Sequence, residues 1–276
     1  MEASMEGRLG LADVAVLTIT RAEAETAKQV FGATHRIGGF YYALPKSSSP
    51  YSVVLRQAAD RGNTPAYEAV KDFVEDLRPR FILLIGTAGG VSTRDRLKVG
   101  DVVVPSYIHY GDFQKMVDGK QHPRHLPFDY PSVLFRETYA RGILDDGNWY
   151  AGVSEKRPTK GKPAVHLDCS LVAGERIWGD PDNAEQIAML NRFEDASALD
   201  MESMGVARAA FSVRRDLDYN LLYGVVRGIC DYVDKPNNDR TRKKWTPYAS
   251  SVAALFGHRV VAEMLKNEST LQGGSS

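Results

Sequence analysis

Short β-branched runs alternate with longer segments of helical periodicity along most of the 276-residue sequence. This alternation predicts parallel strands that are joined by crossover helices. We expect strands at 13–19, 52–57, 81–85, 101–108, 164–172 and 221–229, and helices near 22–31, 66–77, 132–144, 184–192, 202–211 and 245–265. The strand runs are largely apolar, which is typical of strands buried on both faces. The sequence therefore predicts an α/β domain.

The last expected helix and the chain length both indicate one large core. Apolar residues recur there at every fourth position and form one stripe, made of Val252, Phe256, Val260 and Met264. A single core remains favourable up to roughly 250–300 residues. We expect one domain over residues 12–267, with flexible tails at 1–11 and 268–276, since the C-terminal end is rich in Gly and Ser.

Charge and cysteine content exclude several classes of partner. Thirty-five Lys and Arg residues balance 35 Asp and Glu residues, so no global field attracts nucleic acid or an anionic membrane. No apolar stretch reaches the ~18 residues that a membrane helix needs. Cys169 and Cys230 lie in apolar runs without metal-type Cys/His spacing. The sequence predicts a cytoplasmic protein with no nucleic-acid or membrane partner, no metal and no cofactor.

A glycine-rich segment, Gly86-Thr87-Ala88-Gly89-Gly90, follows the expected strand 81–85 directly. Ligands of open α/β sheets gather at the carboxyl ends of strands, and small residues let backbone N–H groups approach a ligand. A tight turn explains the segment equally well. The segment matches neither the dinucleotide fingerprint nor the Walker A loop, because no Lys-Ser/Thr pair follows it. A dinucleotide-binding oxidoreductase is therefore disfavoured.

Carboxylates mark three further positions. Asp200 and Glu202 stand at an expected helix start, where capping is the simpler explanation and hydrogen bonding to two hydroxyl groups is the functional alternative for Glu202. Asp231 ends the last expected strand, where a turn role competes with ligand binding. Thr20 and Glu23 form a capping-box pattern at the end of the first strand. A carboxylate at that strand end can also hold a water molecule.

Taken in order, these segments resemble the nucleoside phosphorylase and methylthioadenosine/S-adenosylhomocysteine nucleosidase superfamily over roughly residues 12–265. The resemblance rests on Gly86–Gly90, on Asp200-Met201-Glu202 and on the segment 227–232. It implies a three-layer αβα sandwich around a mixed, barrel-like sheet, assembled as a homodimer or larger homo-oligomer. A further likeness to domains fused to bacterial antiphage and fungal immunity-like proteins implies antiviral defence with fused or partner signalling domains, and rests on Trp245, Tyr248 and Ala249.

The same resemblance implies roles for individual residues. Asp231 would protonate a departing purine at N7, and Glu202 would hold the ribose 2′- and 3′-hydroxyl groups. Acid assistance and nearby negative charge both favour cleavage of an N-glycosidic bond, which passes through an oxocarbenium-like sugar. Ile177 and Trp178 would frame the base, and Met201 would pack against the sugar. The full set of implied substrate-binding residues is Glu202, Met201, Thr87, Ala88, Gly89, Ile177 and Trp178.

The choice between water and phosphate as nucleophile depends on cationic groups. Phosphorolysis requires donors for a bound phosphate. The phosphorylases carry an arginine where this chain has Leu84, and only Arg21 near the first loop supports phosphorolysis. We therefore expect hydrolysis to free base and sugar, with Glu23 as the carboxylate that positions water and Glu25 as the alternative. A phosphate-dependent phosphorylase and a catalytically silent nucleoside-sensing domain are the competing functions.

The 5′ substituent of the substrate is left open by the sequence. Methylthio, homocysteinyl, hydroxyl and phosphate groups would each contact loops such as 112–129, whose place in the fold the sequence does not give. Basic residues in and near that segment suit a 5′-phosphate or triphosphate, and a solvated polar loop explains them equally well; they are Lys115, Lys120, Arg124, His109, His122 and His125. The expected ligand is thus a small purine nucleoside or nucleotide.

Overall fold

The structure, a computed structural model, describes residues 12–43, 53–94, 96–118, 120–124, 126–217 and 219–273. The strands are β1 (Val14–Thr18), β2 (Ala33–Ile37), β3 (Phe40–Ala43), β4 (Val53–Gln57), β5 (Phe81–Gly90), β6 (Val102–Val103), β7 (Tyr107–Tyr110), β8 (Gln114–Val117), β9 (Lys120–Pro123), β10 (Val165–His166), β11 (Ser170–Ala173), β12 (Ala196–Asp200) and β13 (Leu222–Tyr232). The helices are α1 (Arg21–Phe31), α2 (Asn63–Leu77), the π-helical η3 (Leu134–Ala140), α3 (Arg141–Leu144), α4 (Ala184–Arg192), α5 (Ser203–Leu217) and α6 (Asn238–Gly273).

Strand β5 is the hub of a large mixed sheet. It lies between β1 and β13 and runs parallel to both, so that Leu84 stands opposite Leu17 on one side and Val225 on the other. Across the described residues the strand order is β10-β6-β13-β5-β1-β4-β3-β2. The strands β7, β11 and β12 join this path where β12 pairs antiparallel with the end of β5. The expected α/β fold with a mixed central sheet is confirmed.

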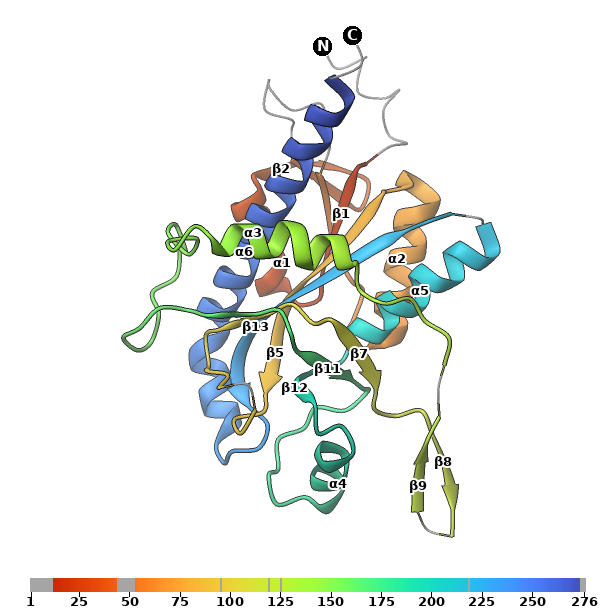
Figure 1. Cartoon of the computed structure of the whole chain (residues 1–276), viewed down its shortest axis with the longest axis vertical. Coiled ribbons are helices and arrows are strands. Elements are labelled where there is room, and N and C mark those ends of the chain that lie inside the picture. The colour runs from red at the N-terminus through yellow and green to blue at the C-terminus, as the bar shows by residue number, and fades with distance from the viewer. Residues whose placement is uncertain are drawn as a thin grey trace.

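Helices cover both faces of the sheet. Ile82 and Leu84 of β5 point into the core that α2 and α5 cover, whereas Leu83 and Ile85 point into the core under α1 and α6. Figure 1 shows these two helix pairs on opposite sides of the strands. The alternation along β5 explains why its sequence is apolar throughout. The predicted core stripe of α6 is also confirmed, because all four of its residues are buried: Val252, Phe256, Val260 and Met264.

The bounds of several elements differ from those expected from the sequence. The segment Gly86–Gly90 is the second half of β5, because its backbone pairs with β13 on one side and with β12 on the other. The expected strand 81–85 therefore covers only the first half of β5. Helix α6 begins at Asn238, seven residues before the start of the helix expected at 245–265. The strand expected at 101–108 is divided into β6 and β7 around Pro105, which has no backbone N–H to donate.

Polar segments account for the remaining differences. The hairpin β2–β3 was missed because its outer strand is largely exposed and carries no apolar alternation. The region expected as a loop after Gly111 contains the antiparallel hairpin β8–β9, which projects away from the sheet (Figure 1). The N-terminal tail expected at 1–11 lies outside the described residues, whereas residues 268–273 of the expected C-terminal tail belong to α6.

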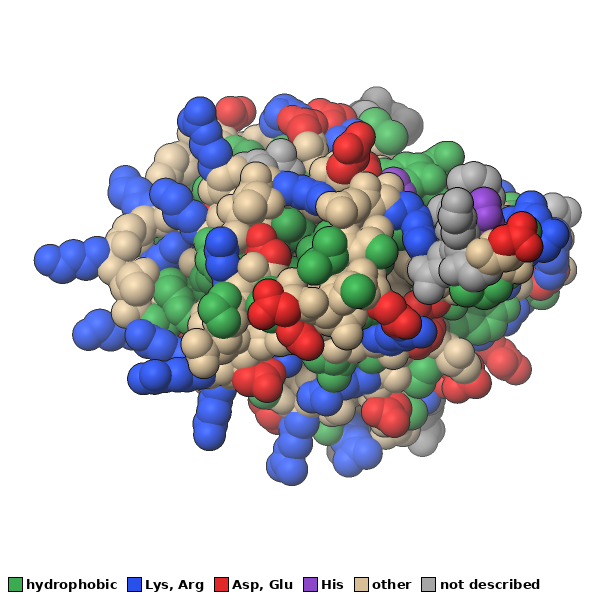
Figure 2. Space-filling view, turned by 90° about the horizontal axis from the view of Figure 1, so that it is seen from below, with side chains coloured by type: hydrophobic (Ala, Val, Ile, Leu, Met, Phe, Trp, Pro, Cys, Tyr) green, Lys and Arg blue, Asp and Glu red, His purple; other side chains and the backbone are tan. Residues whose placement is uncertain are grey.

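The end of the molecule at which β5 terminates is seen face-on in Figure 2. On this face Lys and Arg side chains predominate toward the left edge of the view, whereas Asp and Glu side chains lie mostly toward its middle and right, with further Lys and Arg and with apolar side chains among them. The formal net charge of the whole sequence is zero. Among the described helices, none is long and apolar enough to cross a membrane.

Candidate active site

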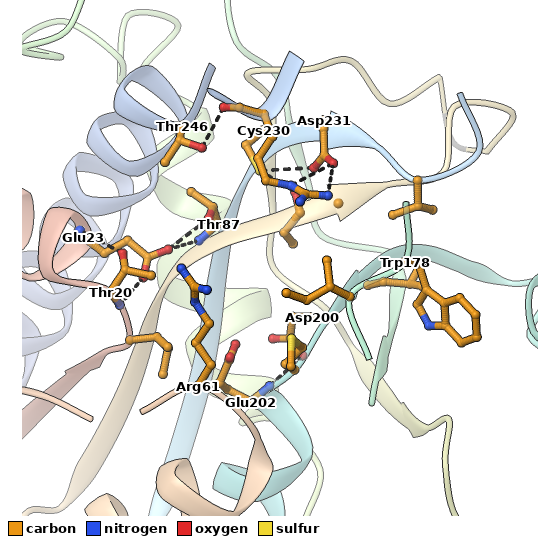
Figure 3. A pocket seen from close by; sticks show the side chains of 18 of the residues that line it. Thr20, Glu23, Arg61, Thr87, Trp178, Asp200, Glu202, Cys230, Asp231 and Thr246 are labelled. Atoms are coloured by element: carbon orange, nitrogen blue, oxygen red, sulfur yellow. Dashed lines mark hydrogen bonds and ion pairs between the residues drawn. The ribbon is translucent and has the colours of Figure 1, made fainter. Parts of the chain in front are cut away.

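The carboxyl ends of β1, β5 and β13 surround an open pocket of about 890 Å³, space open to solvent included. This is the edge of a parallel sheet at which α/β proteins bind ligands. The pocket brings together every residue that the sequence nominated for the site: Glu23, Thr87, Ala88, Gly89, Ile177, Trp178, Met201, Glu202 and Asp231. Figure 3 shows that Glu23, Glu202 and Asp231 enter the pocket from separate elements.

Glu23 is held between α1 and β5. Its Oε2 accepts a hydrogen bond of 2.9 Å from the backbone N–H of Thr20, which completes the predicted capping box at the start of α1. Its Oε1 accepts from the backbone N–H of Thr87 at 2.8 Å and from the Thr87 hydroxyl at 2.9 Å. The capping role and a place in the pocket therefore coexist. Glu25 lies on the outside of α1, where its mostly exposed side chain pairs with Lys28.

Gly86 leaves space for two of the buried charges. A Cβ atom at this position would collide with the guanidinium of Arg227 and would lie 2.9 Å from Oε1 of Glu23. Glycine is thus required for a close approach of β5 to both side chains. The sheet can carry a fully buried arginine behind the pocket only because this strand position has no side chain.

Arg227 connects the two acidic residues at the start of α5. Its Nε and Nη2 donate to Oδ2 of Asp200 at 2.8 and 2.6 Å, and Nη2 also donates to Oε2 of Glu202 at 3.0 Å. Asp200 additionally accepts from the backbone N–H groups of Glu202 and Ser203, which is the predicted cap. The cap and the buried ion pair together fix the backbone from which the Glu202 side chain enters the pocket.

Glu202 itself is almost fully buried. Its Oε1 accepts a 3.3 Å hydrogen bond from the backbone N–H of Gly62, and its Oε2 accepts from Arg227. Burial raises the pKa of Glu202 to about 7, the guanidinium of Arg227 opposes this rise, and the neighbouring Asp200 adds to it. A carboxylate with fixed orientation and partly satisfied oxygens is suited to accept hydrogen bonds from a vicinal diol.

Asp231 ends β13 and has no exposed surface. The Cys230 thiol donates to its Oδ1 at 3.2 Å, and Arg242 from the first turns of α6 donates to its Oδ2. Burial raises the pKa of Asp231 above the ordinary value of an aspartic acid, and the positive charge of Arg242 opposes the rise. A buried carboxyl group with a raised pKa is the form of acid that can donate a proton near neutral pH.

Small and apolar residues form the wall next to Asp231. A Cβ atom at Gly89 would lie 2.5 Å from Cγ1 of Val233 and 3.4 Å from Oδ1 of Asp231, so glycine lets both approach β5. Trp178 lies at the edge of the pocket, apart from the carboxylates (Figure 3), and Ile177 beside it is 59% exposed. This half of the pocket therefore combines a buried acid with apolar and small lining residues.

Three arginines of the pocket were not found by sequence reasoning. They are Arg61 in the loop before α2, Arg176 before α4, and Arg242. Arg61 and Arg176 stand in polar segments without periodicity, and Arg242 lies before the helix expected at 245–265. The only sequence signal for Arg242 was its position eleven residues after the nominated Asp231; in the structure it lies about one helical turn into α6.

The described residues between 112 and 129 do not line this pocket. Lys115 and Arg124, which suited a 5′-phosphate in the sequence, lie in or directly beside the hairpin β8–β9 and are not among the residues that line the pocket. Within the described residues, no group of three or more His, Cys, Asp or Glu side chains is arranged to hold a metal ion.

The model of the phosphorylase superfamily matches residues 20–262. The chain belongs to this superfamily. The match spans all of the nominated site residues, and the resemblance expected from the sequence is confirmed. Within the superfamily, the chain is 22% identical over 247 residues to an ATP nucleosidase, Cap17, of Escherichia coli, with 82% of this chain and 47% of the relative covered. The chain thus spans about half the length of this relative.

A second relative has a more similar length. The 5′-methylthioadenosine/S-adenosylhomocysteine nucleosidase of Listeria monocytogenes is 22% identical over 227 residues, which cover 80% of this chain and 87% of the relative. Among solved structures, the Helicobacter pylori enzyme of the same name superimposes with a TM-score of 0.70 at 17% identity, covering 92% of this chain and 99% of that one. This likeness shows a shared fold.

Proposed function

We propose that the chain hydrolyses the N-glycosidic bond of a purine nucleoside or nucleotide and releases the free base and the sugar. The observation that carries the proposal is the convergence of Glu23, Glu202 and Asp231 on one pocket from α1, the start of α5 and β13. The reaction needs an acid for the leaving base, a carboxylate for the sugar and a carboxylate for water, and these three side chains match those needs.

Asp231 is the proposed general acid. As the bond between C1′ and N9 breaks, its electron pair passes to the purine, and the proton of Asp231 moves to N7. Burial favours the protonated form that this step requires, while the hydrogen bonds from Arg242 stabilise the carboxylate that remains. Trp178 and Ile177 would lie against the base, because they line the same pocket beyond the apolar wall next to Asp231.

Glu202 is the proposed ligand of the ribose diol. Each of its oxygens already has one protein donor and retains acceptor capacity for a hydroxyl group. The negative charge of Glu202 also lies close to the sugar, where positive charge develops in the transition state. Met201, directly before it in the chain, supplies apolar contact to the ring.

Hydrolysis is favoured over phosphorolysis by the contacts of Thr87. Its backbone N–H and its hydroxyl both donate to Oε1 of Glu23, so neither donor is available for a phosphate nucleophile. A phosphate dianion there would also be repelled by the Glu23 carboxylate. A water molecule can instead donate a hydrogen bond to Glu23, attack C1′ and transfer its proton to this carboxylate.

The names of the relatives support an adenine-type base. An ATP nucleosidase and a methylthioadenosine/adenosylhomocysteine nucleosidase both act on adenine derivatives according to their names. We further propose that the chain acts as a homo-oligomer in the cytoplasm, and that the domain works in antiviral defence with fused or partner signalling domains. A silent nucleoside sensor is less favoured, because sensing alone does not require all three carboxylates.

The decisive experiment incubates the purified protein with adenosine, inosine, methylthioadenosine, adenosylhomocysteine, AMP and ATP, with and without phosphate. We expect free purine and a reducing sugar in phosphate-free buffer, measured by chromatography and a reducing-sugar assay, and release at least roughly a hundredfold slower by the Asp231→Asn protein. Release that depends strictly on phosphate and yields a sugar 1-phosphate would replace the hydrolase by a phosphorylase. Binding of nucleoside without any base release would support the sensor.

A further inference from the structure

One arginine of the pocket has no acidic partner among the described residues. Arg176 and Arg242, which also line the pocket, each form an ion pair with a carboxylate, and so does Arg227 behind it. Arg61 lines the pocket, is exposed to it, and has no carboxylate of the described residues within ion-pair distance of its guanidinium. A guanidinium presents several N–H donors in a fixed plane and matches the oxygens of a phosphate group. The unpaired charge therefore points to an anionic part of the ligand.

The position of Arg61 assigns this charge to the sugar end of the pocket. The next residue, Gly62, donates its backbone N–H to Oε1 of Glu202, so the loop before α2 is fixed to the proposed diol ligand. In Figure 3 the Arg61 side chain rises beside Glu202 and points toward Glu23, away from Asp231 and Trp178. The guanidinium thus lies on the opposite side of the pocket from the residues proposed to hold the base.

The geometry of a nucleoside indicates which of its groups extends toward Arg61. The base at C1′ and the 5′ carbon at C4′ leave opposite ends of the furanose ring, and the 2′,3′-diol lies between them on the other face. With the base at Asp231 and the diol at Glu202, the 5′ substituent extends toward the wall that carries Arg61. An uncharged 5′ group would leave the guanidinium without a partner, whereas a 5′-phosphate would accept two hydrogen bonds from it.

Inorganic phosphate is the other source of the same chemistry. It would have to bind below C1′, where Glu23 already takes both donors of Thr87 and where two carboxylates, Glu23 and Glu202, repel an anion. A phosphate attached to the 5′ carbon needs the guanidinium of Arg61 and neither donor of Thr87. The contacts on this side of the pocket therefore favour the substrate-borne phosphate.

We infer that Arg61 binds the 5′-phosphate of the substrate, so that the pocket prefers a purine nucleoside 5′-phosphate to the corresponding nucleoside. This inference rests on the proposed hydrolase function and names its substrate class. Arg61 is then a specificity-determining residue, and the hairpin lysines and arginine that suited this role in the sequence are not needed for it.

The test compares kcat/KM for AMP, ATP, adenosine and adenosylhomocysteine in the wild type and in Arg61→Gln. We expect the wild type to prefer AMP over adenosine at least about tenfold, and Arg61→Gln to lower kcat/KM for AMP by roughly tenfold to a hundredfold, mainly through KM, as for a charged hydrogen bond. The ratio of kcat/KM for AMP to kcat/KM for adenosine should fall in Arg61→Gln by the same factor as kcat/KM for AMP. Arg240→Gln, which changes an exposed arginine outside the pocket, should keep the preference of the wild type.

Several outcomes would overturn the inference. Equal losses for AMP and adenosine in Arg61→Gln would assign Arg61 to the nucleoside part of the ligand, and faster turnover of adenosylhomocysteine than of AMP would indicate a carboxylate-bearing 5′ group. Stimulation of adenosine cleavage by inorganic phosphate that disappears in Arg61→Gln would identify phosphate as a co-substrate. Thermal melts of all variants verify folding, because the exposed Arg61 side chain has no described carboxylate partner to lose.

A separate arm keeps the inference independent of turnover. If no compound releases its base, the hydrolase proposal fails, and calorimetric titration of AMP and adenosine still tests Arg61. We expect AMP to bind more tightly than adenosine, with an advantage that decreases as salt is added, because the contact is electrostatic and solvent-exposed. Equal affinities of the two ligands for the wild type would contradict the 5′-phosphate assignment.

Discussion

Arg242 directs two nitrogen atoms at one oxygen of Asp231: Nε lies 3.1 Å and Nη2 lies 2.8 Å from Oδ2. The pair joins the carboxyl end of β13 to α6 and fixes the plane of the carboxyl group. Burial favours the neutral acid and the guanidinium favours the carboxylate, so the balance of the two sets the pKa of Asp231. Under the proposed mechanism, this ion pair determines the pH range in which the acid carries its proton.

Replacing Arg242 by Gln should move the alkaline limb of the pH profile to higher pH. The positive charge of Arg242 lowers the pKa of Asp231, so its removal raises that pKa further. An acid that works in its protonated form loses activity as the pH rises through its pKa, and this loss would then occur later. Measurement of kcat/KM from acidic to alkaline pH tests the shift, with Arg240→Gln as the control. A limb that stays in place, or moves to lower pH, would contradict this account.

The Asp231→Asn protein should fold normally, bind nucleoside and lose at least roughly a hundredfold in turnover, the lower range for a general acid. Asparagine keeps the volume and can donate a hydrogen bond, but it cannot transfer a proton to N7. Initial rates are measured beside thermal melts. Near-wild-type turnover with reduced stability would show that Asp231 only terminates its strand.

Glu23→Gln should lose turnover at a cost in stability of about 1–3 kcal/mol, the usual effect of one buried donor left without an acceptor. The amide oxygen can still accept the capping hydrogen bond from Thr20, but the amide NH2 then faces the Thr87 N–H, and the charge and the basicity that the proposed water-positioning role requires are removed. Glu25→Gln is the matched control two positions along α1, because Glu25 lies outside the pocket. Loss of activity in the control, with activity retained in Glu23→Gln, would reverse our assignment of the water-positioning carboxylate.

Arg227→Met should destabilise the fold by about 3–5 kcal/mol, the usual effect of removing one partner from a buried ion pair. Asp200 and Glu202 would be left without their shared cation in the interior. Urea unfolding measures the loss. Arg259→Met, which removes a partly exposed pair with Asp146, should cost no more than about 1 kcal/mol. Similar losses in both variants would mean that the buried cluster contributes little to stability.

The parts of the fold and site that follow local rules were predictable from the sequence. Apolar runs located β1, β4 and the first half of β5, and the capping pattern of Thr20 and Glu23 located α1 to within one residue of its start. The nominated carboxylates stand at strand ends or helix starts, which a linear sequence displays. The parallel sheet then brings such positions to one edge, so Glu23 and Asp231 line the same pocket although they are far apart in the chain.

The features that depend on distant pairing were not predictable. Gly86–Gly90 has the composition of a turn, and only β12 and β13 on its two sides make it a strand. Arg227 belongs to the segment 227–232 on which the family resemblance rests, but its burial beside Asp200 and Glu202 is a property of the folded sheet. Arg61 carries no local signal, because a single arginine in a polar loop has the same sequence appearance whether it faces a pocket or bulk water.

The extension of β5 through Gly90 has a consequence for the motions of the pocket. β13 pairs with this extension, the floor of the pocket, along its length, and β12 pairs with Gly89 and Gly90 on the other side, so the amide hydrogens bonded to these strands exchange with solvent only when the sheet itself opens. The loop that carries Arg61 is held instead by hydrogen bonds of Gly62 to Glu202 and of Asn63 to Glu175 and Gly174, which lie outside the sheet and do not require the sheet to open. Ligand binding should therefore slow amide exchange in the loop before α2 and leave the already slow exchange of the floor almost unchanged.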